Sequence, residues 1–278
     1  MMLWLLLLQV WASCLWLGHS EVVNPFASCP QYFYENTPPN NALLPQNPAW
    51  ICQRYNNSYY YATLYDINRR IPVYSAYIYQ PGPGTRRDEW MVEPQLIRNN
   101  LPKEMETEKT LSKNYNITSQ QIGQNQAVNA DYKNLTGLNR GHLNPNSHHN
   151  SNSSKYATFT LTNIVPQNSN LNGGAWNDYE QNTMANESKG CISNTTYVIV
   201  GVVPGNTSIA NGRVNVPSHI WSSACCRMTS NKTKAWAAIV ENKAKNITLL
   251  TLGKLEDQLT NLYGKGKVSL FHSACPRT

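Results

Sequence analysis

Cysteines constrain what this chain can fold into more than any other feature of its sequence. Beyond Cys14, which lies in an apolar N-terminal run, they are Cys29, Cys52, Cys191, Cys225, Cys226 and Cys275. An even number of cysteines in an exported chain predicts a set of disulfides. Adjacent residues rarely meet disulfide geometry, so a bond between Cys225 and Cys226 is discounted. Cys29–Cys52 is then the natural local pair. Cys191 and Cys275 would bond to Cys225 and Cys226, in an order that stays open.

The N-terminal residues predict that the chain is exported. An apolar run from Leu3 to Leu17 is followed by small polar residues and then by the charged Glu21. This pattern indicates a secretory signal peptide over residues 1–20, cleaved near Ser20. An uncleaved membrane anchor is the alternative, but the run is short for a span of about 20 residues. The remainder, residues 21–278, has no linker or repeat and is expected to form a single secreted domain.

Acceptor sequences for N-glycosylation and the net charge agree with export. Asn-x-Ser/Thr begins at Asn56, Asn116, Asn134, Asn152, Asn186, Asn194, Asn206, Asn231 and Asn246. So many acceptors indicate a glycoprotein in which several of them lie on exposed loops. The formal net charge is +7, although only 14% of the residues are charged. This surplus favours polyanionic partners, with simple solubility as the alternative. No Cys or His spacing suggests zinc.

Apolar periodicity predicts an α+β fold with a mostly antiparallel sheet. The β-forming segments 59–65 and 71–79 flank turn residues and predict a hairpin. Segments 224–228 and 235–240 could form a second one. The continuous β-branched run 196–203 predicts a buried central strand.

The middle of the chain reads as a loop, a strand and a helix. Segment 137–152 is rich in His, Asn and Pro and predicts a loop. Segment 158–164 alternates threonines with apolar residues, as a strand does. Segment 171–184 predicts a helix, for which residues 168–170 supply possible N-caps. A further helix is expected through Leu255, Leu259 and Leu262, whereas segment 103–134 is polar and predicts irregular structure with a short helix near Asn129.

Two groups of residues in this middle segment suit phosphodiester hydrolysis. The first is Asn139-Arg140-Gly141-His142. It places a guanidinium, which can bind phosphate, beside an imidazole that is largely neutral at pH 7 and can take a proton. Gly141 would let the backbone approach a bulky anion. A structural, hydrogen-bonded histidine is the alternative.

The second group follows in 162–167 and continues with Asn172, Trp176 and Glu180. The last three are four residues apart and would share one broad helix face. Trp176 would pack inward, so that Asn172 and Glu180 address a site at the edge of the helix. An amphipathic helix with a polar rim is the alternative.

Together these groups resemble the active-site signature of the DNA/RNA non-specific endonuclease family, whose members are ββα-metal nucleases. The intervals of 30 residues from His142 to Asn172 and 8 residues from Asn172 to Glu180 also fit that family. Vertebrate members of the family have short sequence motifs similar to those at residues 74–77, 90–95 and 141–145, and to Trp221 followed by Cys225-Cys226. The resemblance covers roughly residues 25–275.

The resemblance implies a ββα-metal fold, in which helices flank the central sheet, and a role for each residue of the signature. His142 would be the general base that deprotonates water. Asn172 would be the direct protein ligand of a largely hydrated Mg²⁺, or of Mn²⁺ or another divalent cation. Asn163, Glu180 and Asn139 would form the polar shell around that ion and its waters. Arg140 would stabilise charge on the phosphate.

A second arginine should come from the loop before Trp90. Arg87 is the choice there, with Arg86 as the alternative because the register is uncertain. Cleavage of DNA and RNA would leave 5′-phosphates. It would show no sequence preference, because contacts to phosphate and metal carry no sequence information. No contact with a membrane is expected once the signal peptide is removed.

One departure from the family pattern concerns Asn139, which stands where the family has Asp. Asn keeps the shape and an acceptor oxygen but loses the charge. An active enzyme is expected. The alternative is a catalytically weakened, secreted nucleic-acid-binding glycoprotein on the same scaffold; a glycoprotein that binds another protein is a third, weaker possibility.

Three other features receive structural interpretations. His148 and His149 lie in a polar loop and are expected to be solvated. His219 is expected to pack structurally, and the tyrosines 59–61 are expected on a sheet surface.

Overall fold

A computed structural model of the chain describes residues 22–23 and 25–278. The predicted signal peptide, residues 1–20, lies outside the described residues. Within the described part of the chain, no helix has the length and apolar character needed to span a bilayer.

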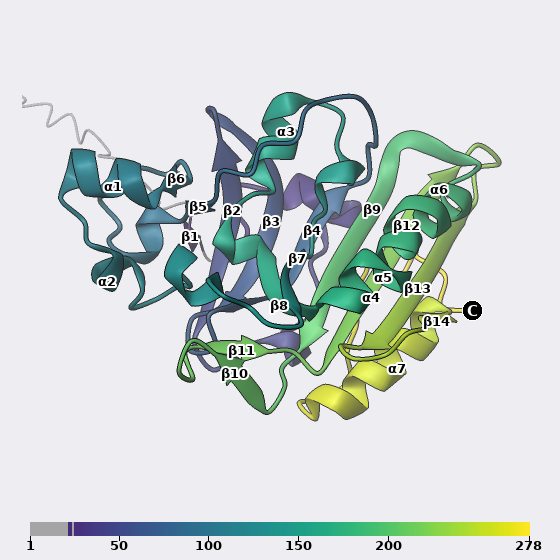
Figure 1. Cartoon of the computed structure of the whole chain (residues 1–278). Helices are drawn as coiled ribbons and strands as arrows, with labels where there is room; N and C mark the ends of the chain where they lie inside the picture. The colour runs from purple at the N-terminus through teal and green to yellow at the C-terminus, as the bar shows by residue number, and fades with distance from the viewer. Residues whose placement is uncertain (1–21, 24) are drawn as a thin grey trace, which may run out of the picture.

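An eight-stranded sheet forms the centre of the molecule (Figure 1), and every neighbouring pair of its strands is antiparallel. In spatial order the strands are β1 (Val22–Val23), β2 (Pro48–Tyr55), β3 (Ser58–Asp66), β4 (Ile71–Ile78), β9 (Cys191–Val203), β12 (His219–Met228), β13 (Thr233–Glu241) and β14 (Thr248–Leu250). Three small antiparallel pairs lie outside it. They are β5 (Met91–Val92) with β6 (Glu106–Thr107), β7 (Leu138–His142) with β8 (Ile164–Asn168), and β10 (Thr207–Ile209) with β11 (Val214–Val216).

The sheet confirms the α+β class and the elements predicted within it. Segments 59–65 and 71–79 are the hairpin β3–β4, and segments 224–228 and 235–240 belong to the hairpin β12–β13. The β-branched run 196–203 lies in β9, which pairs with β4 on one side and with β12 on the other. The segment with the strongest local β-propensity is therefore also a central, buried strand of the sheet.

Helices surround the sheet in short pieces. They are α1 (Glu108–Tyr115), α2 (Ser119–Ile122), α3 (Asn152–Ala157), α4 (Ser169–Gly173), α5 (Ala175–Asp178), α6 (Met184–Glu187) and α7 (Leu252–Tyr263). Helix α7 confirms the prediction from leucine spacing. Helices α1 and α2 occupy a segment predicted to be irregular. They begin at the N-caps Thr107 and Thr118, whose side chains accept from backbone N–H groups, and they have few apolar residues to reveal them.

The predictions around residues 137–184 need correction. Segment 158–164 is not a strand, because its threonines are all buried with polar partners and its alternation does not mark a solvent face. It contains the 3₁₀ turn Leu161–Asn163, and strand β8 begins only at Ile164. The predicted loop contains strand β7, which ends at His142.

The predicted helix 171–184 is interrupted once and contains a turn of a different helix type. Asn168 caps α4 as predicted, because its side chain accepts from the backbone N–H groups of Asn170 and Leu171. Gly174, which has φ −113° and ψ −111°, interrupts the helix after α4. After α5 comes a π-helical turn, Tyr179–Thr183, and then α6. Paired glycines are poor helix formers, which accounts for the break.

The sheet separates two apolar cores. Val198, Val200 and Val202 of β9 pack with residues of the hairpin β7–β8 and of the segment α4–α6. Ile199 and Val203 point the other way and pack with α7 and the N-terminal segment. This is the alternation expected of a strand. We call the two sides the hairpin face and the α7 face.

Three disulfides join the described cysteines. Cys29–Cys52 is confirmed, and the order left open is resolved as Cys191–Cys226 and Cys225–Cys275. Cys225 belongs to the core of the α7 face and Cys226 to that of the hairpin face. Because consecutive side chains of a strand point to opposite faces, the two neighbours bond to different partners.

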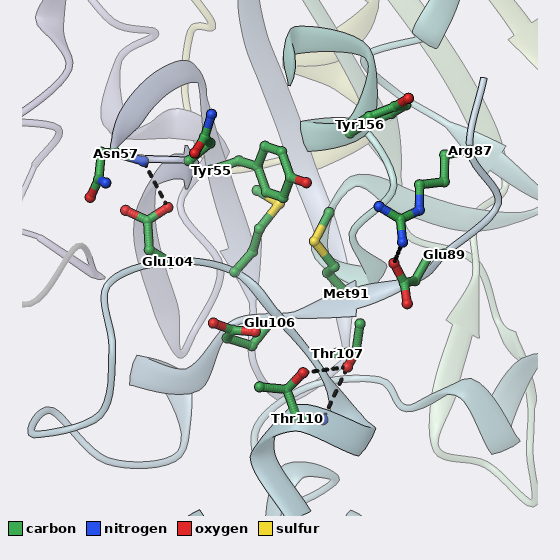
Figure 2. Close-up of a pocket in the computed structure, with 12 residues that line it drawn as sticks. Tyr55, Asn57, Arg87, Glu89, Met91, Glu104, Glu106, Thr107, Thr110 and Tyr156 are labelled. Carbon is green, nitrogen blue, oxygen red and sulfur yellow. Dashed lines mark hydrogen bonds and ion pairs between the residues drawn. The ribbon is translucent and has the colours of Figure 1, made fainter. Parts of the chain in front are cut away.

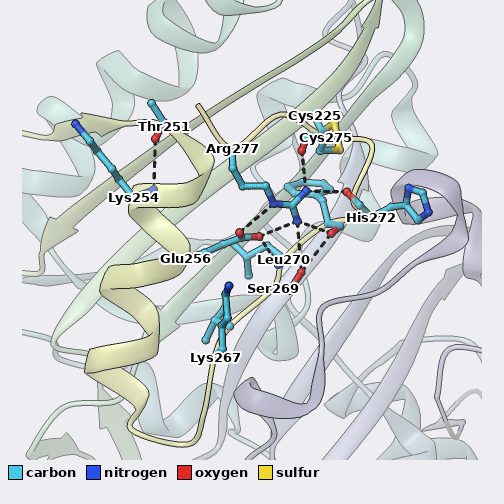
Figure 3. Close-up of polar contacts among 12 residues, drawn as sticks. Cys225, Thr251, Lys254, Glu256, Lys267, Ser269, Leu270, His272, Cys275 and Arg277 are labelled. Atoms are coloured by element: carbon cyan, nitrogen blue, oxygen red, sulfur yellow. Dashed lines mark hydrogen bonds and ion pairs between the residues drawn. A yellow bond between two sulfur atoms is a disulfide. The ribbon is translucent and has the colours of Figure 1, made fainter.

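A buried ion pair fixes the C-terminal segment against α7 (Figure 3). The Arg277 guanidinium donates to both carboxylate oxygens of Glu256, at 3.1 Å each. It also donates to the carbonyls of Phe271, His272 and Cys275. Because these acceptors compensate the desolvated charges, the segment that carries Cys275 is held in place.

Candidate active site

The hairpin β7–β8 and helix α4 form a ββα unit on the hairpin face. His142 pairs with Ile164 and Gly141 with Val165 in the hairpin register. A Cβ on Gly141 would lie 2.1 Å from Oε1 of Gln167 and 2.6 Å from its Cβ. The close packing of Gln167, rather than an approaching anion, is therefore what requires glycine in this structure.

A cleft of about 200 Å³ opens beside this unit. Its lining residues are Arg86, Arg140, His142, Pro145, Asn146, Ser147, Asn172, Asn177, Glu180 and Gln181. The fold thus brings together four of the sequence-predicted site residues, His142, Arg140, Asn172 and Glu180. They come from strand β7, helix α4 and the π-helical turn, which lie up to 40 positions apart in the sequence.

His142 lies in an aromatic setting that sequence reasoning did not assign. Its ring lies 5.4 Å from that of Trp90 and 5.0 Å from that of Phe159, measured between centroids. Nε2 is buried and has no hydrogen-bond partner in the described residues. Burial, with a smaller effect of the nearby Arg86 charge, lowers the pKa of His142 to about 3. The imidazole is therefore neutral at pH 7, and an anion beside it would raise its proton affinity.

Two arginines reach the cleft. The Arg140 guanidinium lies 4.8 Å from the Trp90 ring centroid and 5.6 Å from that of Tyr132. Burial lowers the pKa of Arg140, although the group stays charged at pH 7. Arg86 lies 5.1 Å from the Phe159 ring centroid and forms an exposed ion pair with Asp88. Both guanidiniums lie over aromatic rings. Nε of Arg86 donates to Asp88 at 3.0 Å and Nη2 of Arg140 donates to the Asn129 carbonyl at 3.4 Å, so their other N–H groups are the ones that could bind an anion.

Arg87, the arginine chosen from the sequence, does not line this cleft. It forms an ion pair with Glu89 at 2.7 Å and lines a separate pocket with Tyr156 (Figure 2). Consecutive side chains of an extended segment point to opposite sides, so only one of the two neighbours can face the cleft. The structure places Arg86, the alternative, in that position.

Glu180 is fixed by its backbone. Nε2 of His148 donates to the Glu180 carbonyl at 2.9 Å, and Nδ1 then accepts from the Tyr77 hydroxyl at 2.9 Å. Burial raises the pKa of the Glu180 carboxyl to about 8. His148 is therefore not solvated as predicted. His149 is not solvated either, since it is buried against Asn144 at 2.8 Å.

Asn163 does not have the contacts predicted for it. It is fully buried, and its Oδ1 accepts from the Ser75 hydroxyl and from the Asn144 N–H. Its Nδ2 donates to the carbonyls of Asn144 and Thr158. Because all four hydrogen-bonding positions of the amide are used, Asn163 holds the chain after His142 and has none left for a metal-bound water.

Asn139 also lies apart from the cleft. It is exposed, pairs with Gln167 in the β7–β8 register, and does not line the cleft. The residue at which this chain departs from the family pattern is therefore on the solvent side of β7.

The cleft's donors fit a hydrated divalent cation. Asn172 and Glu180 offer amide and carboxylate oxygens, the ligand type that Mg²⁺ prefers. Among the described residues there is no cluster of three or more His, Cys, Asp or Glu side chains that could enclose a metal. An ion in this cleft would therefore keep most of its waters.

Comparisons with known proteins agree with the geometry. The sequence profile of the DNA/RNA non-specific endonuclease family matches residues 38–273. The human endonuclease domain-containing 1 protein is 34% identical over 204 residues, which cover 72% of this chain and 39% of that protein. The mouse protein of the same name is 30% identical over 223 residues, 76% of this chain and 40% of that protein.

The chain thus spans about two fifths of the length of these two relatives. A solved structure, the EndoG/EndoGI complex described as showing the mechanism of EndoG inhibition, has a chain with 18% identity and a TM-score of 0.48. That likeness covers 73% of this chain and 81% of the other. With the family profile matching most of its length, this chain belongs to the DNA/RNA non-specific endonuclease family.

Proposed function

We propose that this chain is a secreted, metal-dependent endonuclease that hydrolyses phosphodiester bonds of DNA and RNA without sequence preference. One observation carries the proposal. A single cleft is lined by an imidazole, two guanidiniums, an amide and a carboxyl group. These are the groups needed to take a proton from water, bind a phosphate and hold a divalent cation.

His142 is the general base in this proposal. His142 is half-buried and lines the cleft, where its neutral imidazole can accept the proton of an attacking water. The flanking rings of Trp90 and Phe159 fix the imidazole plane. A phosphate entering the cleft adds negative charge, which favours the protonated imidazole that forms as the water is deprotonated.

Arg86 and Arg140 bind the phosphate. Both present guanidinium N–H groups, which match phosphate oxygens in pairs. Because a phosphate is the same in every nucleotide, this mode of binding selects no sequence and admits both DNA and RNA. Release of the 3′-oxygen as the leaving group would give 5′-phosphate ends.

Asn172 would hold the divalent cation directly, and Glu180 would hold its waters. A neutral amide ligand leaves the positive charge of the ion almost undiminished. When bound, Mg²⁺ would supply neutralisation of charge on the phosphate and the leaving oxygen. The ionised Glu180 carboxylate would be favoured by that charge, because a nearby cation lowers a carboxyl pKa.

Three observations support the proposal that the protein is secreted. The six described cysteines all form disulfides, which persist in oxidising compartments. The sequence contains many N-glycosylation acceptors, and residues 1–20 have the pattern of a signal peptide. An extracellular nuclease is consistent with these features.

A plasmid-nicking assay on purified protein tests the proposal. With Mg²⁺ the wild type should convert supercoiled plasmid to nicked and linear forms and should degrade RNA, and EDTA should abolish both. His142→Ala should slow cleavage at least about a hundredfold while leaving the fold intact, because general bases contribute effects of that size.

His219→Ala is the matched control, since His219 is a half-buried histidine outside the cleft. It should cut at the wild-type rate. If His142→Ala cleaves as fast as His219→Ala, the assignment of the base is wrong. If the wild type cuts nothing with any divalent cation while binding nucleic acid, the weakened binding protein is the correct function.

A further inference from the structure

The segment 86–91 separates two hollows of the molecule. Arg86 lines the cleft, and Trp90 of the same segment contacts His142. Arg87, Glu89 and Met91 line a second pocket of about 340 Å³ instead. One extended stretch of backbone thus lies between the two hollows, so a strand that leaves the cleft across this stretch would reach the second pocket.

The walls of this second pocket suit a flat, uncharged ring (Figure 2). Tyr55 and Tyr156 line it, with their ring centroids 6.4 Å apart in an edge-to-face arrangement. Met91 and Met105 contribute thioether side chains. Aromatic and methionine side chains at a hollow of this kind provide stacking and dispersion contacts for a planar ligand.

The charges of the pocket disfavour a phosphate. Glu89, Glu104 and Glu106 contribute carboxyl groups. Arg87 is engaged by Glu89 at 2.7 Å, and Glu104 is engaged by Arg54 at 3.2 Å and by the Asn57 N–H at 3.3 Å. In the described part of the chain Glu106 has no ion-pair partner, and it lies on β6 facing the same hollow. Glu106 interacts with the Thr110 side chain, and its remaining acceptor positions are what the pocket offers to a ligand.

We propose that this pocket binds an unpaired nucleobase of the substrate strand, from a nucleotide beside the phosphate held in the cleft. The base would stack on the Tyr55 ring, which is perpendicular to that of Tyr156, and donate an exocyclic amino group to Glu106. The pocket would therefore favour amino-bearing bases. Because a paired base cannot leave its helix without cost, the subsite would act on single strands. Cleavage of duplexes would therefore stay without sequence preference, and the base preference would appear on single strands alone. The assumption that a substrate strand lies in the cleft rests on the nuclease function proposed above.

Cytosine and uracil give the sharpest comparison. They have the same size, but cytosine has an amino group at position 4 where uracil has a carbonyl. A carboxylate accepts from the amino group, whereas it faces the carbonyl oxygen without a hydrogen bond. A charge-assisted hydrogen bond of this kind predicts about a tenfold difference in affinity.

Binding is measured without catalysis. The protein is first stripped of N-linked sugar, because Asn56 lies on the rim of the pocket and begins an acceptor sequence. Calorimetric titrations in EDTA then use cytidine and uridine monophosphates, each as the 3′ and the 5′ isomer. At least one cytidine isomer should bind about tenfold more tightly than its uridine counterpart.

Two variants test the residues. Glu106→Gln should reduce the cytidine preference to less than about twofold, because an amide offers both a donor and an acceptor. Tyr55→Ala should weaken both nucleotides alike. Glu241→Gln, an exposed carboxyl outside the pocket, is the matched control and should retain the wild-type preference.

Cleavage gives a second readout, which separates this inference from the nuclease function. On a single-stranded oligonucleotide of mixed sequence, the wild type should cut more often beside C than beside T, and Glu106→Gln should lose this bias. Equal affinity for cytidine and uridine nucleotides, or a cut pattern that Glu106→Gln leaves unchanged, overturns the subsite. Absence of nicking alone contradicts only the nuclease, since the nucleotide titrations contain no metal.

Discussion

The two faces of the central sheet differ in the polar side chains that they bury. The α7 face is packed with apolar side chains and contains the disulfides Cys29–Cys52 and Cys225–Cys275. The hairpin face contains a connected set of buried polar side chains. Gln53 of β2 donates to Thr162 at 2.9 Å and to Thr63 at 3.2 Å. Thr63 contacts Ser75 at 3.0 Å, and Ser75 donates to Asn163 at 2.9 Å.

The difference follows from what each face carries. The α7 face supports a regular helix, whose backbone groups satisfy one another. The hairpin face supports the chain around His142, a 3₁₀ turn and a π-helical turn, in which many backbone groups lack regular partners. Buried backbone groups must find hydrogen bonds, so side-chain amides and hydroxyls supply them there. Apolar packing and disulfides thus stabilise the α7 face, whereas side-chain hydrogen bonds position the chain around His142 on the hairpin face.

The largest effect on stability should come from removing a cross-link of the α7 face. Replacing both Cys225 and Cys275 by Ala opens a loop with a sequence separation of 50 residues. The free energy of unfolding should fall by about 4 kcal/mol, as measured by urea denaturation. The nicking rate at a temperature where the variant is folded should stay at the wild-type value. A tenfold slower rate would mean that the two faces are not independent.

A slightly smaller loss of stability should follow from Asn163→Ala on the hairpin face, but with loss of activity. The variant leaves four partners without their hydrogen bonds, which should lower the free energy of unfolding by about 3 kcal/mol. The chain after His142 should shift, so that nicking slows. Asn215→Ala is the matched control, because Asn215 is also buried and bonds to Gly205 and Thr207. Equal nicking rates for the two variants would contradict the division of roles.

Glu93 should make the hairpin face sensitive to pH. Burial raises the pKa of this carboxyl to about 8 from 4.5, and the hydroxyls of Thr160 and Thr162 donate to it. The folded protein keeps a proton that the unfolded chain releases. The stabilisation is therefore complete below pH 4.5 and is lost as the pH rises towards 8.

Unfolding of the wild type and of Glu93→Gln, compared at pH 6.0 and at pH 7.5, measures this effect. The wild-type advantage over the variant should shrink by about 2 kcal/mol across that interval. Taking the difference between the two proteins cancels the buried histidines, which titrate in both. A constant difference would show that Glu93 is ionised throughout.

The smallest expected effect concerns Gly141. Gly141→Ala places a Cβ against Gln167, which must move, and overpacking of this kind costs at least about 1 kcal/mol. Thermal unfolding measures the loss. Gly173→Ala is the control, since a Cβ there meets nothing within 4 Å and Ala is the better helix former, so the melting temperature should stay the same or rise slightly. Equal melting temperatures for the two variants would show that Gln167 moves aside freely.

The sequence was informative where one local pattern decides the structure. The β-branched strand β9, the two hairpins and the leucine-spaced helix α7 could all be predicted, as could the grouping of His142, Arg140, Asn172 and Glu180 in one cleft. Prediction failed where tertiary partners decide. The threonines of segment 158–164 alternate like a strand, yet buried acceptors such as Glu93 hold them in turns.

Burial of polar residues was the hardest property to predict. His148, His149 and Asn163 look solvent-facing or water-binding in the sequence, and only their distant partners make them internal. Similarly, nothing local distinguishes Arg86 from Arg87. Which of them faces the cleft depends on how the segment 86–91 lies between two hollows.

The adjacent cysteines of β12 have a consequence for the alignment of that strand with β9. A slip by a single residue would turn Cys225 toward the hairpin face and Cys226 toward the α7 face, so that neither would meet the partner it bonds in the native structure. Oxidation can therefore seal both bonds together only when β12 is correctly aligned. Together the two bonds therefore fix the alignment of β12 with β9 in the folded protein.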